Sequence, residues 1–190
     1  MKTVLKAFSF LGLISALSAW VVIDISIVLN PWFDIFRHAF SDLGGPEANY
    51  PWVYNFGLIS VSILVFLYSI YLATVAGNKI EVIGSAFLMI ASVFLALIGL
   101  FPAGTRPHTF VSTWFFIQMD LAIIAWGLGL LVRGLRDIGS IFIAMGIISP
   151  ILALILEWPS IAVLEAFGIA VIDLWVLLMF FKVHRASIEI

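Results

Sequence analysis

The sequence predicts an all-α, polytopic membrane protein folded as a bundle of six transmembrane helices, and three observations support this. Of its 190 residues, 64% are hydrophobic and 11% are charged, whereas soluble domains carry roughly 25% charged residues. Six apolar segments approach the length of about 20 residues that a spanning helix requires. The links between these segments are short, so we expect residues 1–190 to form a single transmembrane domain.

The six predicted spans lack the strict alternation of a strand, and helices satisfy every backbone polar group within the lipid. Their expected bounds are Leu5 to Leu29, Val53 to Ala76, Ile80 to Phe101, Thr109 to Val132, Ile138 to Trp158 and Ser160 to Lys182. Pro150 is the only proline inside a span, and we expect it to bend the fifth helix.

The distribution of Lys and Arg predicts the orientation, because cytoplasmic links are enriched in these residues. The two ends of the chain and the second and fourth links hold Lys2, Lys6, Lys79, Arg133, Arg136, Lys182 and Arg185. The opposite links hold only Arg37 and Arg106, and they also contain six of the seven prolines. We therefore expect a multi-pass protein of the cell membrane with both termini in the cytoplasm.

Charge and cysteine content exclude several classes of partner and site. The formal net charge is -2 and there is no basic stripe, so a nucleic-acid partner is not expected. The chain contains no cysteine, which removes disulfides, thiolate metal sites and thiol nucleophiles.

The link between the first two spans carries the clearest local pattern in the chain. Apolar and polar residues recur there at helical spacing on opposite faces, the apolar set being Trp32, Ile35, Phe36, Ala39, Phe40 and Leu43. This predicts a short interfacial amphipathic helix between the first and second spans, either an anchor or a functional element. In such a helix His38 and Asp42 are four residues apart, so an imidazole and a carboxylate can meet.

Two other links on the same side supply partners for that polar face. His108 opens the fourth predicted span with Ser112 one turn further on, and Glu157 lies in the last link. We expect a polar pocket at the outer leaflet, although capping and solvated roles fit these residues as well. Arg37, Arg106, Glu157 and Asn55 are the expected substrate-binding residues.

Two chemistries fit the expected pocket. A divalent metal such as zinc can be held by His38, Asp42 and His108, because imidazole and carboxylate are suitable ligands and the metal activates water. Without a metal, His38 oriented by Asp42 can act as a general base toward Ser41, Ser112 or water.

Four carboxylic acids lie well inside the predicted spans, away from their ends, where charged groups are costly and usually face a cavity or a partner. Asp24 and Glu165 lie in the outer quarter of their helices, and Asp120 and Asp173 lie near the middle. Glu165 and Asp173 are about 80° apart on one helix, so both can face the bundle interior. These acids fit either a proton path or carboxyl groups hydrogen-bonded between helices.

Several short motifs resemble those of a six-helix membrane family of unknown function that is common in archaea. They are Ser41-Asp42-Leu43-Gly44-Gly45, Pro51, Asn55-Phe56-Gly57, Gly99-Leu100-Phe101-Pro102 and His108. The resemblance that they indicate covers almost the whole chain. A more distant similarity is to the Frag1/DRAM/Sfk1 superfamily, whose members show a Ser-Asp-x-Gly outer motif and a His that opens a later helix. Some of those proteins are linked to membrane lipid handling, so the resemblance implies membrane lipids as the substrate class. By position, the resemblance carries over to Ser41, Asp42, Gly44, Asn55 and His108.

Three functional classes remain open. The first is a membrane-embedded protein that binds or processes a lipid-like molecule, by hydrolysis or acyl transfer if it is an enzyme. The second is a proton- or cation-coupled transporter that uses the buried carboxylates, although no internal repeat supports it. The third is a non-catalytic scaffold or lipid sensor. Haem held between His38 and His108 is a further hypothesis. The sequence specifies neither the oligomeric state nor the reaction.

Overall fold

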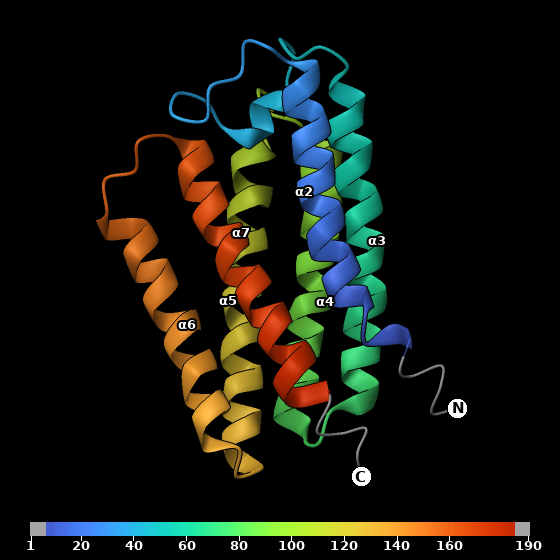
Figure 1. Cartoon of the computed structure of the whole chain (residues 1–190), viewed down its shortest axis with the longest axis vertical. Helices are drawn as coiled ribbons and strands as arrows, with labels where there is room; N and C mark the ends of the chain where they lie inside the picture. The colour runs from blue at the N-terminus through green and yellow to red at the C-terminus, as the bar shows by residue number, and fades with distance from the viewer. Residues whose placement is uncertain (1–6, 185–190) are drawn as a thin grey trace.

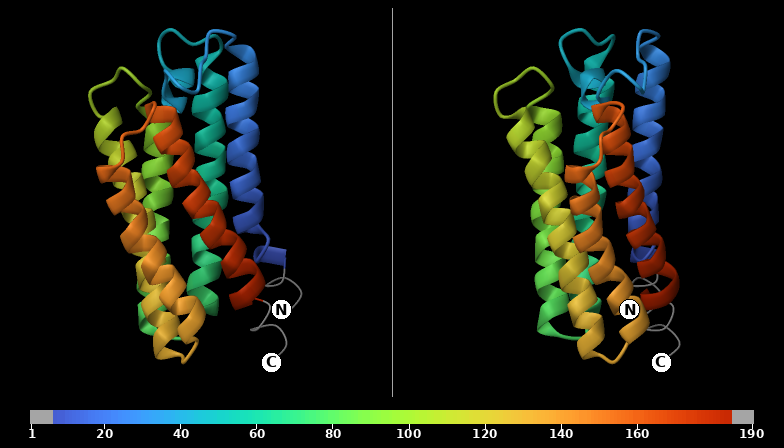
Figure 2. Two further views of the ribbon diagram at one scale, coloured as in Figure 1. Left: turned by 60° about the vertical axis from the view of Figure 1, so that its left-hand side comes forward. Right: turned by 90° about the vertical axis from the view of Figure 1, so that its left-hand side faces the viewer.

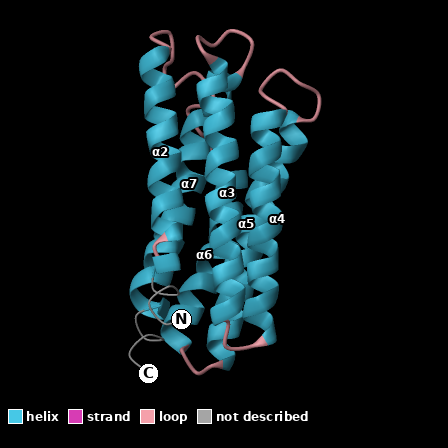
Figure 3. Cartoon of the chain, turned by 90° about the vertical axis from the view of Figure 1, so that its right-hand side faces the viewer, coloured by secondary structure: helices cyan, strands magenta, loops and turns pink. Residues whose placement is uncertain are grey.

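A computed structural model describes residues 7–184 of the chain, and within this range it contains helices and no strand (Figure 3). The long helices are α2 (Leu11–Leu29), α3 (Pro51–Val75), α4 (Lys79–Leu100), α5 (His108–Val132), α6 (Arg136–Ile155) and α7 (Ile161–Leu178). A 3₁₀ helix, η1 (Phe40–Gly44), precedes α3, and a π-helical segment, η2 (Met179–His184), continues α7. All six long helices are long and apolar enough to cross a membrane, which confirms the predicted six-helix membrane bundle.

Each long helix packs against the next, and α7 returns to contact α2, α5 and α6 (Figures 1 and 2). Three links, residues 30–50, 101–107 and 156–160, lie together at one end of the bundle, which we call the cap end (Figure 1). The two short links, residues 76–78 and 133–135, lie at the opposite end. α7 is the least buried of the six described spans, so it is the most loosely held wall of the bundle.

Local sequence explains where several helices begin. Asn78 caps α4 by accepting hydrogen bonds at its side chain from the backbone N–H groups of Ile80 and Glu81. Ser160 caps α7 in the same way by accepting from Val163. Pro51 occupies the first position of α3, where its missing N–H leaves no donor unpaired.

The predicted amphipathic helix is present only in part. Residues 31–38 form turns, and the helical part of this link is η1, a single short helix over Phe40–Gly44. Its apolar side faces the bundle, because Phe40 and Leu43 are 2% and 0% exposed. η1 therefore packs into the cap end of the bundle, in contact with α2, α3 and α7.

Backbone hydrogen bonds explain why the turns replace the helix. The carbonyl of Ile35 accepts from the Ser160 hydroxyl, and the carbonyl of His38 accepts from the N–H of Ala162 at 2.9 Å. The first turn of α7 has N–H groups without a partner inside the helix, and the His38 carbonyl satisfies that of Ala162. Tertiary docking on α7 thus overrides the helical periodicity of the link.

The other predicted boundaries are within three residues of those observed, apart from the start of the first span and the end of the last, where α7 ends at Leu178 and η2 continues it. The residues from 5 to 10 precede α2, which begins at Leu11. α6 continues through Pro150 and ends at Ile155, three residues before the predicted end. Lys2, Lys6 and Arg185, which contributed to the predicted orientation, lie outside the described residues.

Candidate functional site

A cavity of about 120 Å³ lies inside the bundle. Its described lining comes from α2, α3, α4, α5 and α7, with η1 at the cap end, while no residue of α6 belongs to it. α6 therefore packs on the outside of a five-helix ring.

The lining residues of the cavity extend along the helices. On α7 its lining runs from Glu165 to Val176, and on α5 from His108 to Met119. Eleven residues of α-helix correspond to about 16 Å. Half of a hydrocarbon core of roughly 30 Å is about 15 Å, so the cavity extends over about the depth of one leaflet.

Most of the wall is apolar. The aliphatic and aromatic lining residues are Ala16, Ala19, Ile23, Phe40, Leu58, Val61, Val65, Leu88, Leu95, Ile98, Phe115, Phe116, Met119, Ile169, Ile172, Trp175 and Val176. An apolar cavity of this kind stays dry when nothing fills it. At about 24 cal/mol per Å³, leaving it empty costs roughly 3 kcal/mol of stability, which a filling ligand would recover in part.

Polar groups gather where the cavity reaches the cap end. Ser41 of η1, Tyr54 of α3, His108 and Ser112 of α5, and Glu165 of α7 all line this part. They come from four segments that are distant in sequence, and each lies in the first turns of its helix next to the cap. The site is thus a mainly apolar cavity with a polar cluster at its cap end, which we call the head cluster; Ser15 and Tyr68 also line the cavity, further from the cap.

Glu165 connects the head cluster to η1. Its carboxylate accepts a hydrogen bond from the backbone N–H of Phe40, at 2.6 Å, and another from the backbone N–H of Ser41. Hydrogen bonds to a charged carboxylate are stronger than those between neutral groups. Ser160 and Ala162 at the start of α7 also donate to carbonyls of the link before η1. Together these hydrogen bonds hold η1 and that link against α7.

His108 is held in one tautomer. Its Nδ1 atom lies 2.8 Å from the carbonyl oxygen of Phe101, and because a carbonyl only accepts, Nδ1 must carry the proton. In the neutral ring, Nε2 is then an acceptor. The ring contacts the cavity, so His108 brings a proton-accepting nitrogen to the head cluster.

A second carboxylate lies deeper in the cavity. Asp173 is two turns beyond Glu165 on α7, about 12 Å further along the helix. Its Oδ2 atom accepts a hydrogen bond of 2.7 Å from the indole N–H of Trp20 on α2. This bond joins the two helices across the apolar part of the wall.

The proposed pair of His38 and Asp42 is not formed as a catalytic dyad. The Nδ1 atom of His38 accepts from the backbone N–H of Asp34 at 2.9 Å, and its ring packs against Trp32 and Phe33. Asp42 accepts from the backbone N–H of Ala39 inside η1. The expected contact relied on an α-helical spacing that this link does not adopt.

The expected zinc ligands are likewise not assembled. Within residues 7–184, no group of three or more His, Asp or Glu side chains is arranged to hold a metal ion. His108 lines the cavity, whereas His38 and Asp42 are absent from its lining. The geometry of the described residues therefore does not fit the metal site that we expected at His38, Asp42 and His108.

Most of the other expected substrate-binding residues lie away from the cavity. The side chain of Arg37 is 80% exposed and pairs with Asp34 at 3.3 Å, and Arg106 and Glu157 are exposed. Among the acids in the spans, Asp24 is exposed on α2. Asp120 lies between α5 and α6, 3.4 Å from the Ser149 hydroxyl, and is not part of the lining.

Asn55 has a structural role together with two glycines. Its side-chain N–H donates to the carbonyl of Gly44 at 3.0 Å. A Cβ atom on Gly44 would lie only 2.2 Å from the Asn55 Oδ1 atom, and one on Gly99 only 2.4 Å from the Asn55 carbonyl oxygen. The motifs that contain these residues therefore hold η1, α3 and α4 in close contact around the cap.

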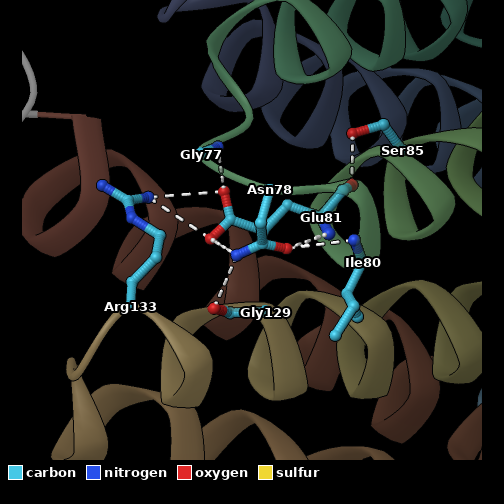
Figure 4. Close-up of polar contacts among 7 residues, drawn as sticks. All are labelled: Gly77, Asn78, Ile80, Glu81, Ser85, Gly129 and Arg133. Carbon is cyan, nitrogen blue, oxygen red and sulfur yellow. Dashed lines mark hydrogen bonds and ion pairs between the residues drawn. The ribbon is translucent and has the colours of Figure 1, made fainter.

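The sequence analysis missed a polar network at the opposite end (Figure 4). Glu81 of α4 is 0% exposed and accepts from the N–H of Gly77 at 2.6 Å and from Arg133 at 3.3 Å. Asn78 donates to the carbonyl of Gly129 at 2.9 Å. The network thus joins the α3–α4 link to the end of α5. The Asn78-x-x-Glu81 spacing resembles a helix-capping pattern and was the available signal.

Comparisons with known proteins gave a single kind of match. Neither the search of curated proteins nor the search of solved structures found a match. The family described as "Protein of unknown function (DUF998)" matches residues 13–182, a range that includes all the residues given as lining the cavity. The chain is an integral, multi-pass membrane protein and belongs to this family of unknown function.

Proposed function

We propose that this protein binds one chain of a lipid-like molecule in its internal cavity, with the polar head of that molecule at the head cluster. The observation that carries the proposal is the match between the apolar, leaflet-deep cavity and the polar cluster at one end. A membrane lipid has the same two parts in the same order. The distant resemblance to the Frag1/DRAM/Sfk1 superfamily supports the same substrate class.

The proposal places the cap end at the outer face of the cell membrane, with both chain ends in the cytoplasm. Its support is the distribution of basic residues, because Lys79, Arg133 and Arg136 lie in or beside the links of the opposite end. The bound chain would then belong to the outer leaflet. α7 is the helix that would move to let the lipid chain enter the cavity, since it is the least buried span.

Identification of a retained lipid tests the proposal. After purification in a mild non-ionic detergent, native mass spectrometry should detect one lipid per chain that survives removal of the detergent. Extraction and analysis should then show one lipid class enriched over its abundance in the source membrane. Lipid content that simply reflects the composition of the membrane would contradict a dedicated site.

The head cluster also supports a reaction on the bound lipid, either hydrolysis or acyl transfer. His108 would act as the general base through Nε2, taking a proton from the Ser41 hydroxyl or from water. Loss of a positioned base typically lowers a rate by 10²- to 10⁴-fold. We therefore expect His108→Gln to retain the lipid but to turn over a labelled acylglycerol at least about 100-fold more slowly. Equal rates for the two proteins would exclude this role.

A second candidate function, a proton- or cation-coupled transporter, rests on a different observation. Glu165 and Asp173 line the same cavity at two depths, as residues of a proton path do. In proteoliposomes, this function predicts substrate-driven acidification that Asp173→Asn abolishes and that Asp24→Asn, on the exposed face of α2, leaves unchanged. Absence of acidification with the wild-type protein would favour lipid binding alone.

A further inference from the structure

The chemistry of the head cluster restricts which lipid heads it can hold, and this inference rests on the proposed function. We infer that the ligand is a lipid-like molecule whose head donates hydrogen bonds, a hydroxyl or an amine, and that anionic heads are rejected. The inference names a ligand class and assigns the discriminating contacts to Glu165 and His108.

Glu165 supplies the first restriction. Two backbone N–H groups already donate to its carboxylate, and an ionised carboxylate has about four acceptor positions in total. The ionised Glu165 side chain, which lines the cavity, therefore keeps acceptor capacity for a bound head. When Glu165 is ionised, a phosphate or carboxylate head placed there would meet a like charge in a partly buried site, where repulsion is stronger than in water.

His108 supplies the second restriction. The bond from Nδ1 to the Phe101 carbonyl leaves Nε2 as an acceptor. A head that only accepts hydrogen bonds therefore gains nothing from this ring in its neutral form. An O–H or N–H group can instead donate to Nε2, to Glu165, or to both.

The rest of the described lining does not compensate for an anion. None of the described residues that line the cavity is Lys or Arg, and Arg37 is exposed and paired with Asp34. The hydroxyls of Ser41 and Tyr54 both donate and accept, so they fit either kind of head. The preference is thus set by Glu165 and His108.

The test compares four probes that share one palmitic chain length: monopalmitoylglycerol, hexadecylamine, palmitate and methyl palmitate. Apparent Kd values are measured by native mass spectrometry at about pH 9 in one non-ionic detergent, so that Glu165 is ionised. We expect the glycerol and amine heads to bind at least about tenfold more tightly than the other two, a difference of about 1.4 kcal/mol. The first two probes distinguish a hydroxyl head from an amine head.

Matched substitutions assign the preference to the site. Glu165→Gln should reduce the advantage of hexadecylamine over palmitate by at least about tenfold, because the amide is neutral and also donates. Glu157→Gln makes the same change at an exposed position of the cap end outside the lining, and it should leave the ranking unchanged.

The outcomes separate this inference from the proposed function. Equal binding of all four probes, or tighter binding of palmitate, would overturn the inference and leave a lipid site in place. If no probe binds more tightly to the wild type than to a variant whose cavity is filled, the proposed function fails as well. The ranking in the wild-type protein decides the inference even if Glu165→Gln does not fold.

Discussion

Ala19→Phe is expected to abolish lipid binding while leaving the bundle folded and at least as stable as the wild type. Ala19 lines the cavity from α2, and a phenyl ring there would occupy the space that the proposal gives to the lipid chain. Filling an apolar void recovers part of the roughly 3 kcal/mol that the empty space costs. The bound lipid should fall at least about tenfold, as measured by native mass spectrometry, with an unchanged or higher Tm.

The matched control is Ala170→Phe on α7. Ala170 is exposed on the outside of the bundle and does not line the cavity, so the same change there should affect neither the retained lipid nor the Tm. Equal lipid content in the two variants would show that lipid is held on the outer surface. A large fall in the Tm of Ala19→Phe would show that the side chains around the void cannot accommodate a ring.

Arg133→Met is expected to destabilise the fold at the end opposite the cap. Glu81 is 0% exposed, and Arg133 is the cation that pairs with it. Removing one partner of a buried pair leaves a charge without compensation, which typically costs 3–5 kcal/mol. The Arg133 side chain is 30% exposed, so we expect a smaller loss, about 2 kcal/mol, in the free energy of unfolding, visible as a lower Tm.

Two further variants test the origin of that loss. Arg136→Met removes a neighbouring exposed arginine, and it should change the stability by less than about 0.5 kcal/mol. The double variant Glu81→Leu with Arg133→Met should be more stable than Arg133→Met alone, because no buried charge is then left unpaired. If Arg133→Met and Arg136→Met were equally stable, Glu81 would not depend on its ion pair.

The long helices could be predicted from the sequence because one physical requirement dominates them. A segment of about 20 apolar residues in lipid has to satisfy its own backbone hydrogen bonds. The short cap link is subject to no such requirement. Its helical spacing from Trp32 to Leu43 predicted an α-helix, yet docking of its carbonyls on Ser160 and Ala162 produced turns and η1.

The cavity could not be predicted, because its wall combines side chains from five helices and η1. Helices that are apolar on every face carry little sequence information about which face turns inward. The sequence therefore could not distinguish Asp173, which lines the cavity, from Asp120, which faces α6. His108 and Ser41 were predicted as site residues, whereas Tyr54 carried no local signal that would have identified it.

Photolabelling with a palmitoyl probe that carries a photoreactive group near the end of its chain tests the central claim most directly. The account predicts adducts on residues that line the interior, such as Val61, Met119 and Ile172, and loss of these adducts in Ala19→Phe. Adducts confined to lipid-facing positions such as Val28 and Leu154, which are 79% and 86% exposed, would contradict it.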